Sequence, residues 1–425
     1  MLKERNDSAK KGTKKDKVVR RELCSVLTKG TRTHSHLDEG TSQEEISAPS
    51  SVLLCLIEES VQHSTQNSPR SSAVVFGACL VDTVLSTIIF AQFEDNQQLS
   101  RLRTMLTHYC PTEVLMQVDD CSQVTRSAVS ILAPRASVEY LPTEEIPTPD
   151  DVALEIQSKQ YWASAPDALQ SILRDKDFNS SRRILRAFGG ILFHLRRCRI
   201  DHEIMSAGKM ATYIPFDNDS SSTCLESSSR HVEHLILDDV ALANLEVLCN
   251  SFDRSEGGSL WNLINRCKTS FGSRMLREWL CKPLVSLSHI SARSDAIAEL
   301  LLLNAEVDRA SVILKGIPDV ERLLSRVHCN GLLNRANSHP DSRAVMFEPS
   351  LYNSRKIRDF ADILSGFEAL LDVIKVFDDI ELKSSTLNRI LKSAPIGVFP
   401  SKDMCKSLSY FRYIQYVNLL SVGLF

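Results

Sequence analysis

Carboxylates that follow β-branched runs are the residues of this chain best placed to hold a catalytic metal. Asp82 directly follows the apolar run Ala73–Val81, and Glu94 and Asp95 follow the next run, Val84–Phe93. A two-metal nuclease needs several carboxylates that converge on one point, but Glu94 and Asp95 have no obvious partner in the sequence. An aspartate that caps a turn is therefore the favoured interpretation of Asp82, and a metal-dependent nuclease is the less favoured alternative.

The motifs of nucleotide, serine-hydrolase and metalloprotease sites are absent. The sequence contains no G-x-x-x-x-G-K-[ST], G-x-G-x-x-G, G-x-S-x-G or H-E-x-x-H. Asp201, His202 and Glu203 are adjacent, but adjacent residues of a helix point in different directions and cannot converge on one metal. The twelve cysteines lack C-x-x-C spacing, which indicates free thiols in a reducing compartment. We therefore expect neither a catalytic residue nor a bound metal or cofactor in this chain.

Basic residues near the N-terminus are weak candidates for DNA contact. Lys and Arg displace the counterions that condense on nucleic-acid phosphates, so a basic run can supply non-specific affinity. Charge alone equally fits the solvated edge of a strand, and that interpretation is favoured. The candidates are Lys17, Arg20, Arg21, Lys29 and Arg32.

A second basic cluster lies in an apolar segment, Arg182–Ile200, which contains six arginines and no acidic residue. Arg182 and Arg186 are spaced at i, i+4 and share a helix face, where like charges repel unless they are paired in space. The acidic loop 136–155 and DNA are equally suitable partners. The cluster comprises Arg182, Arg183, Arg186, Arg196, Arg197 and Arg199.

Hydrophobic periodicity divides the chain into an α/β part and a helical part. Residues 73–118 contain two β-branched runs, a helical segment and a further strand, which predict a mixed sheet with helix cover. The run 73–93 is long enough to span a membrane, but its polar interruptions favour a buried hairpin. Residues 38–72 indicate a linker with one local element at 52–57. Beyond about residue 159 the apolar spacing is helical.

The overall composition is that of a globular protein. The chain has 425 residues, of which 43% are hydrophobic and 24% charged, and its formal net charge is -3. This composition excludes a wholly disordered or collagen-like chain, and the length predicts about two to three domains. The first residues lack the apolar region of a secretory signal.

A set of motifs in the helical part resembles the core of MutS, the DNA mismatch-repair family. Each motif is weak alone, and their joint order is specific. The residue pattern of Phe271–Leu284 alone predicts a core helix with Trp279 on its apolar face. The motifs are Leu237–Glu246, Gly257–Leu260, Phe271–Leu284, Arg293–Ile297 and Ile317–Arg326.

The resemblance extends over residues 17–399. Val18–Thr31 resembles the segment that leaves the family's mismatch-binding domain, and Gly77–Thr83 with Arg101–Arg103 resembles its connector domain. Three further segments resemble the larger subunit of the eukaryotic MutSα heterodimer. They are Tyr213–Phe216, Trp279–Leu284 and His339–Ala344.

The sequence also departs from the family pattern. The Phe-x-Glu motif that wedges beside a mispaired base is absent, as is the phosphate loop of the family's ATPase. The chain ends about where the clamp helices should follow, so we expect a fragment. Phe411–Phe425 is apolar without a stop signal, and we interpret it as a divergent tail or as the read-through end of a gene model.

The resemblance implies a multidomain fold, α/β followed by mainly α. The connector would be ribonuclease H-like without nuclease chemistry, and the core and lever would be all-helical. The implied divisions are a disordered basic tail (1–16), the end of the mismatch-binding domain (17–37), a linker (38–72), the connector (73–158) and an incomplete core and lever domain (159–425).

The resemblance also implies roles. In the family, connector and lever couple the ATP state to the grip on mismatched DNA, and the connector meets a MutL-type protein. We accordingly expect a nuclear protein that pairs with a MutS homologue two type subunit, with ATP and magnesium bound only by full-length members. The alternative is a stand-alone helical interaction protein. Helix packing and buried polar pairing are the roles implied for Asn244, Glu246, Arg274, Trp279, Asp295 and Arg322.

Overall fold

The protein is described here from a computed structural model, in which the chain divides into two compact units. One, the sheet unit, comprises Met1–Ser227, Leu237–Ala241 and Ser325–Tyr352, and the other, the helical unit, comprises Ser228–Ile236, Leu242–Leu324 and Asn353–Phe425. Among the described residues, no helix combines the length and apolar character needed to cross a membrane. The described residues are 2–4, 21–23, 26–31, 51–61, 73–162, 164–174, 181–213, 234–235, 237–331 and 349–392.

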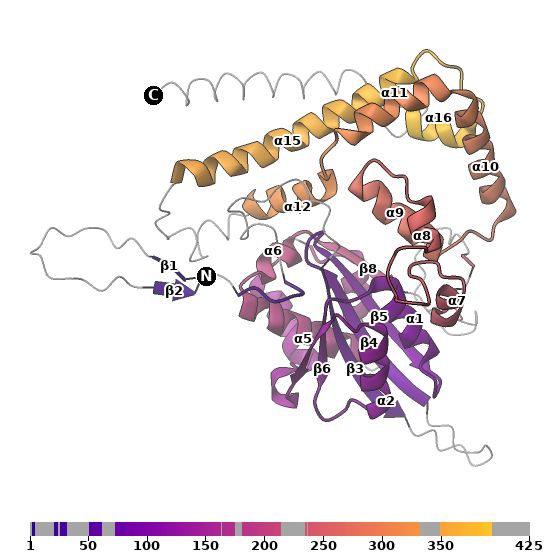
Figure 1. Cartoon of the computed structure of the whole chain (residues 1–425). Helices are drawn as coiled ribbons and strands as arrows, with labels where there is room; N and C mark the ends of the chain where they lie inside the picture. The colour runs from indigo at the N-terminus through magenta and orange to yellow at the C-terminus, as the bar shows by residue number, and fades with distance from the viewer. Residues whose placement is uncertain are drawn as a thin grey trace, which may run out of the picture. The chain divides into compact units, whose positions relative to one another are not determined.

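A six-stranded mixed sheet forms the centre of the sheet unit (Figure 1). Its strand order is β7-β6-β3-β4-β5-β8. The central strands β3, β4 and β5 are antiparallel, whereas β6, β7 and β8 join by parallel pairing. The sheet confirms the predicted α/β character and the hairpin predicted at 73–93, which extends to Asp95. The strands are β3 (Val52–Val61), β4 (Ala73–Asp82), β5 (Thr87–Asp95), β6 (Glu113–Gln117), β7 (Ser137–Leu141) and β8 (Lys209–Tyr213).

Helices cover both faces of this sheet. On one face α1 and α2 bury Leu102, Met105 and Val129 against the strands. On the other face α5 packs together with α3, α4 and α6, and burial of each large apolar side chain there stabilises the fold by about 1.5–3 kcal/mol. The helices are α1 (Ser100–Tyr109), α2 (Gln123–Leu132), α3 (Pro149–Lys159), α4 (Asp167–Leu173), α5 (Arg182–Cys198) and α6 (Asp201–Ser206).

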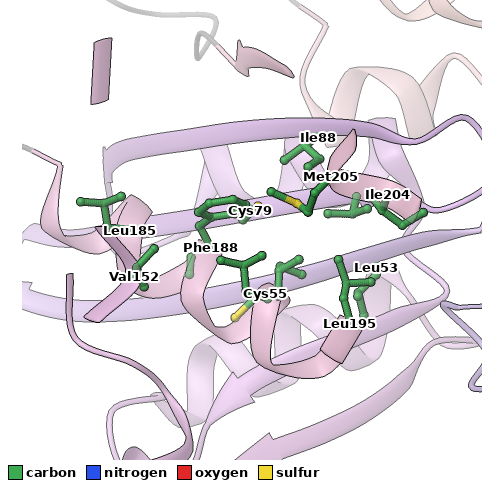
Figure 2. Packing of buried hydrophobic residues seen from close by; sticks show 14 of the residues in the cluster. Leu53, Cys55, Cys79, Ile88, Val152, Leu185, Phe188, Leu195, Ile204 and Met205 are labelled. Atoms are coloured by element: carbon green, nitrogen blue, oxygen red, sulfur yellow. The ribbon is translucent and has the colours of Figure 1, made fainter. Parts of the chain in front are cut away.

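Helix α5 lies unusually close to the strands because glycines face them. A Cβ on Gly190 would lie 2.7 Å from Cys55 Sγ, and one on Gly77 would lie 2.5 Å from the backbone carbon of Arg183. The close approach places Phe188 edge-on against Phe90, with ring centroids 5.2 Å apart. Figure 2 shows Phe188, Leu185 and Leu195 of α5 beside Cys55 and Cys79 of the strands.

The linker predicted at 38–72 is wrong where β3 lies. Val52–Val61 is a central strand, paired with β4 on one side and β6 on the other. Its unbroken apolar run is typical of a strand that is buried on both faces, but the same run fits a short local element equally well. The α/β unit therefore begins before residue 73.

The predicted boundary at residue 158 is also wrong. Helix α5 and strand β8 belong to the sheet unit, because α5 covers the sheet and β8 pairs with β5. The amphipathic period of α5 predicted a helix correctly, but periodicity does not reveal whether a helix packs on a sheet or on other helices. At the N-terminus, β1 (Leu2–Glu4) pairs with β2 (Arg21–Leu23), and the rest of the tail 1–16 lies outside the described residues.

Helices make up the helical unit, as predicted. Ala310 of α11 packs with Val373 of α15 and with Phe377, and Ala296 of α10 packs with Leu387 of α16. Two of the helices below, α7 and α12, also carry residues of the sheet unit. The helices are α7 (Asp239–Asn244), α8 (Leu260–Ile264), α9 (Ser270–Cys281), α10 (Leu287–Leu302), α11 (Asn304–Lys315), α12 (Val320–Gly331), α15 (Pro349–Val376) and α16 (Ser385–Leu391).

The ends of α9 and α12 follow local sequence rules. Helix α9 ends at Cys281, as expected from Pro283, because the residue before a proline avoids helical backbone angles. Helix α12 begins at Val320, two residues after Pro318. Asp319 acts as the cap, since its Oδ1 accepts a hydrogen bond from Arg322 N at 3.3 Å.

Candidate functional site

The predicted DNA-contact residues are placed only in part. Lys17, Arg20 and Arg32 lie outside the described residues. Arg21 pairs with Glu4 in the register of β1 and β2, and Lys29 is exposed in the segment 26–31. DNA contact by this cluster therefore stays a prediction.

The arginines of α5 mostly face acidic side chains of the sheet unit. Two of these partners, Glu139 and Glu155, lie in the acidic segment 136–155, so the acidic alternative is confirmed for their arginines. Arg186 also donates to Gln117 Oε1 at 2.8 Å. Arg182 and Arg199 are exposed. The pairs are Arg183–Glu59, Arg186–Asp120, Arg196–Glu155 and Arg197–Glu139.

The carboxylates at the strand ends cap turns and a helix. Asp82 Oδ1 accepts hydrogen bonds from Val84 N and Leu85 N at 2.9 and 3.0 Å, which confirms the turn aspartate. Asp95 accepts from the backbone at the start of α1, including Leu102 N at 2.9 Å. Burial raises the pKa of Asp95, against the opposing effect of these hydrogen bonds. Both groups are thus used structurally, which removes the motive for a nuclease at Asp82.

Asp201 and His202 of α6 both lie against Tyr161, with His202 Nε2 4.0 Å from Asp201 Oδ2, so the expected divergence is wrong for this pair. Asp201 Oδ2 accepts a hydrogen bond from the Tyr161 hydroxyl at 3.0 Å, and the His202 ring lies 4.8 Å from the Tyr161 ring. The Glu203 side chain is buried. Asp201 and His202 thus stabilise the packing of α6 beside Tyr161.

Sequence reasoning missed a buried cluster of Glu113, Glu139 and His194. Its members come from β6, β7 and α5, and one ligand atom from each lies within 4.8 Å of the others. Glu113 and His194 are buried, and burial lowers the pKa of His194 although both carboxylates oppose this effect. No local motif marks the cluster, because three separate elements supply it; the only signal was a polar residue at the start of an otherwise apolar strand.

The ionic junction of the helical unit is centred on Arg274. Its Nη1 and Nη2 donate to Asp319 Oδ2 and Oδ1 at 2.6 and 2.8 Å, and Nη2 also donates to Glu321 Oε2 at 2.7 Å. The Asp319 side chain is fully buried, and Arg322 Nε lies 3.3 Å from its Oδ2. Burial by itself lowers the pKa of Arg274. The hydrogen bonds to Asp319 and Glu321 outweigh the effect of burial, so the pKa of Arg274 is raised.

This junction fixes α9 to α12, and α15 packs beside it on the start of α12. Arg274 belongs to α9, and Asp319 caps α12. Helix α15 approaches the same point at Gly366, where a Cβ would lie 2.9 Å from Val320 Cγ2. A bidentate arginine–carboxylate pair sets orientation as well as distance. The junction can therefore hold α9 and α12 in one arrangement.

The interpretation of α9 as a core helix is wrong for its apolar stripe. Trp279 and Met275 are 44% and 56% exposed. The Arg293 guanidinium of α10 lies 3.9 Å from the centroid of the Trp279 ring, in a cation–π arrangement. Spacing predicts an apolar face correctly, but it does not predict what covers that face.

The remaining motif residues lie at the surface or in a turn. Asn244 ends α7 and is exposed, and Asp295 is exposed on α10. Glu246 Oε1 accepts hydrogen bonds from the hydroxyl and the backbone nitrogen of Ser251, and these bonds lower its pKa. Glu246 thereby stabilises the turn that follows α7.

Comparison with known proteins identifies relatives for most of the chain. Residues 240–407 match the family model of MutS domain III. The DNA mismatch repair protein Msh6 of Gallus gallus is 33% identical over 411 residues, covering 91% of this chain and 30% of the relative. The protein of the same name from Homo sapiens is 32% identical with the same coverage, and MSH6 of Saccharomyces cerevisiae is 27% identical over 90% of this chain. The chain spans about 30% of the length of the vertebrate relatives.

Proposed function

Because this chain belongs to the MutS family of DNA mismatch-repair proteins, we propose that it acts in mismatch repair as the connector and lever part of a MutSα-type large subunit. Similarity to Msh6 over 411 residues, which include both units, supports this role. The sheet unit would be the ribonuclease H-like connector, and the helical unit the core and part of the lever.

The Arg274–Asp319 junction is the observation that carries a coupling role. Coupling between distant sites is carried by packed side chains and rigid elements that have two discrete arrangements, so the helices of a lever must stay joined while they change position. The bidentate pair links α9 to the cap of α12 with the Asp319 carboxylate fully buried. Helix α12 itself contains Ser325, where the sequence of the sheet unit resumes.

The partners follow from the same role. Mismatched duplex DNA and a MutS homologue two type subunit would be bound through a full-length protein, and a MutL-type protein through the connector. ATP and magnesium would be bound by the family's ATPase domain and not by this chain, whose sequence has no phosphate loop. The chain is then not itself an enzyme, and its place of action is the nucleus. The alternative remains a stand-alone helical interaction protein.

A complementation assay tests the proposal. Residues 51–392 would replace the matching segment of a full-length Msh6-type protein in cells that lack their own, and the mutation rate would be measured. We expect the chimera to lower the mutation rate, the same chimera with Arg274→Ala to lose this effect, and Arg309→Ala to keep it. Arg309 is a suitable control because it is 64% exposed on α11. A stably expressed chimera that leaves the mutation rate high contradicts the proposal.

A further inference from the structure

His194 presents a buried ring nitrogen that lacks a hydrogen bond. The side chain is fully buried on α5, and its Nε2 has no hydrogen-bond partner among the described residues. The nearest acceptor is Glu113 Oε1 at 3.8 Å, too far for a hydrogen bond. Burial without a partner costs stability. The distance suits two ligands of one ion, because metal–ligand bonds of roughly 2.0–2.2 Å place opposing ligands about 3–4 Å apart.

Glu113 is held so that one oxygen remains directed at His194. Its Oε2 accepts hydrogen bonds from Thr28 Oγ1 and from Gly30 N, the latter at 2.7 Å. Gly30 is fitted to this carboxylate, since a Cβ there would lie 2.7 Å from Glu113 Cβ. Hydrogen-bonded support of this kind orients metal-ligating carboxylates in proteins. The segment 26–31 thus fixes Glu113 and leaves Oε1 as the ligand atom.

Glu139 is the third ligand candidate, because the three residues each offer a ligand atom and these atoms lie within 4.8 Å of one another. One imidazole with two carboxylates suits zinc and similar transition ions, whereas magnesium and calcium take oxygen ligands.

Arg197 already pairs with Glu139, the third ligand candidate. Its Nη2 lies 2.6 and 2.7 Å from the two oxygens of Glu139 and 3.2 Å from His194 Nδ1. The side chain is 41% exposed, so its guanidinium has a path to solvent. Two buried or half-buried carboxylates and one arginine leave the cluster with a net negative charge. A divalent ion matches both carboxylates, and Arg197 competes with it for Glu139.

We propose that Glu113, Glu139 and His194 form a binding site for a divalent transition-metal ion of the zinc class, with Arg197 occupying Glu139 in the metal-free protein. The site lies between β6, β7 and α5, where an ion would join the edge of the sheet to its covering helix. Its role would be structural, because the ion would join two strands to the helix that covers them. It does not depend on the role in mismatch repair.

Titration of the full chain with zinc tests the site, with cobalt as a spectroscopic probe. We expect one ion per chain and visible cobalt absorption without the near-ultraviolet band of thiolate ligation. Glu139→Gln and His194→Gln should weaken zinc binding about tenfold or more. Arg197→Met should strengthen it, because the competing cation is gone. Magnesium should not compete.

His202→Gln is the matched control, because His202 also lies near a carboxylate, 4.0 Å from Asp201, and should leave zinc binding unchanged. His194→Gln changes a buried residue and could unfold the unit, but Glu139 and Arg197 are 32% and 41% exposed, so their variants keep the test decisive. Zinc binding that is equal in all variants and is lost after thiol alkylation means an adventitious ion only, on exposed thiols such as Cys110 and Cys267. That result, or no zinc binding at all, overturns the proposal.

Discussion

Arg274 and Asp319 face each other in a bidentate ion pair, with Nη1–Oδ2 and Nη2–Oδ1 distances of 2.6 and 2.8 Å. The arginine is 23% exposed and the aspartate is fully buried. Removal of one member of a buried pair leaves the other charge without compensation and destabilises a protein by about 3–5 kcal/mol. The pair therefore determines whether α9 and α12 stay together.

Arg274→Ala should lower the free energy of unfolding of the helical unit by about 3 kcal/mol or more, because Asp319 then loses its main partner. Urea unfolding followed by circular dichroism measures the change. Arg309→Ala removes an exposed pair with Glu306 and should change stability by less than about 1 kcal/mol. Equal losses of unfolding free energy in the two variants would show that the junction contributes no more to stability than an exposed ion pair.

Gly77→Ala should destabilise the sheet unit by about 1–3 kcal/mol, as overpacking does. The added Cβ would lie 2.5 Å from the backbone of Arg183, so α5 would have to move away from the sheet. Thermal unfolding monitored by circular dichroism measures the loss. Gly331→Ala is the control, since nothing lies within 4 Å of the position of its Cβ. A neutral Gly77→Ala would contradict the close packing of α5.

Asp95 should give the sheet unit a specific pH dependence. Burial raises its folded-state pKa, so its contribution to stability is complete below the unfolded pKa of about 3.9 and is lost as the pH rises through the folded pKa. Asp95→Asn keeps an oxygen acceptor for the backbone of α1 and removes the titration. The wild-type free energy of unfolding should therefore fall relative to that of Asp95→Asn as the pH rises above about 4. Parallel pH profiles would refute the raised pKa.

The two basic clusters should differ in DNA binding. Arg183 and Arg196 are paired with Glu59 and Glu155, so their joint replacement by glutamine should leave non-specific duplex affinity nearly unchanged. Replacement of Lys17 and Arg20 by glutamine should weaken it. Fluorescence anisotropy across salt concentrations measures both, and each lost phosphate contact should reduce the slope of log K against log salt by about 0.9. A larger loss of duplex affinity in the Arg183 and Arg196 variant than in the Lys17 and Arg20 variant would contradict this prediction.

The local sequence pattern predicted individual helices and strands better than it predicted which of them pair or pack together. Alternating and helical periods correctly predicted the hairpin of β4 and β5 and the helical segment of α1. The apolar run of β3 did not reveal a central strand, because its pairing with β6 joins residues far apart in the chain. Long-range pairing leaves no local period, and this is also why the boundary beyond residue 158 was missed.

The candidate sites show the same limit. The motif around Arg274 could be recognised from its sequence, but its partner Asp319 lies in a different motif, and only the fold brings the two together. Trp279 was predicted on an apolar face, yet Arg293 covers it instead of a core. Glu113, Glu139 and His194 come from two strands and a helix, so no spacing rule could find their cluster.

Mismatch-stimulated ATP turnover tests the central claim most directly. The full-length chimera that carries residues 51–392, paired with its MutS homologue two type subunit, would be compared with its Arg274→Ala and Arg309→Ala variants on matched and mismatched duplexes. The account predicts that Arg274→Ala keeps basal turnover and loses most of the stimulation by a mismatch, while Arg309→Ala retains both. Full stimulation in a folded Arg274→Ala chimera would contradict a coupling role for this junction.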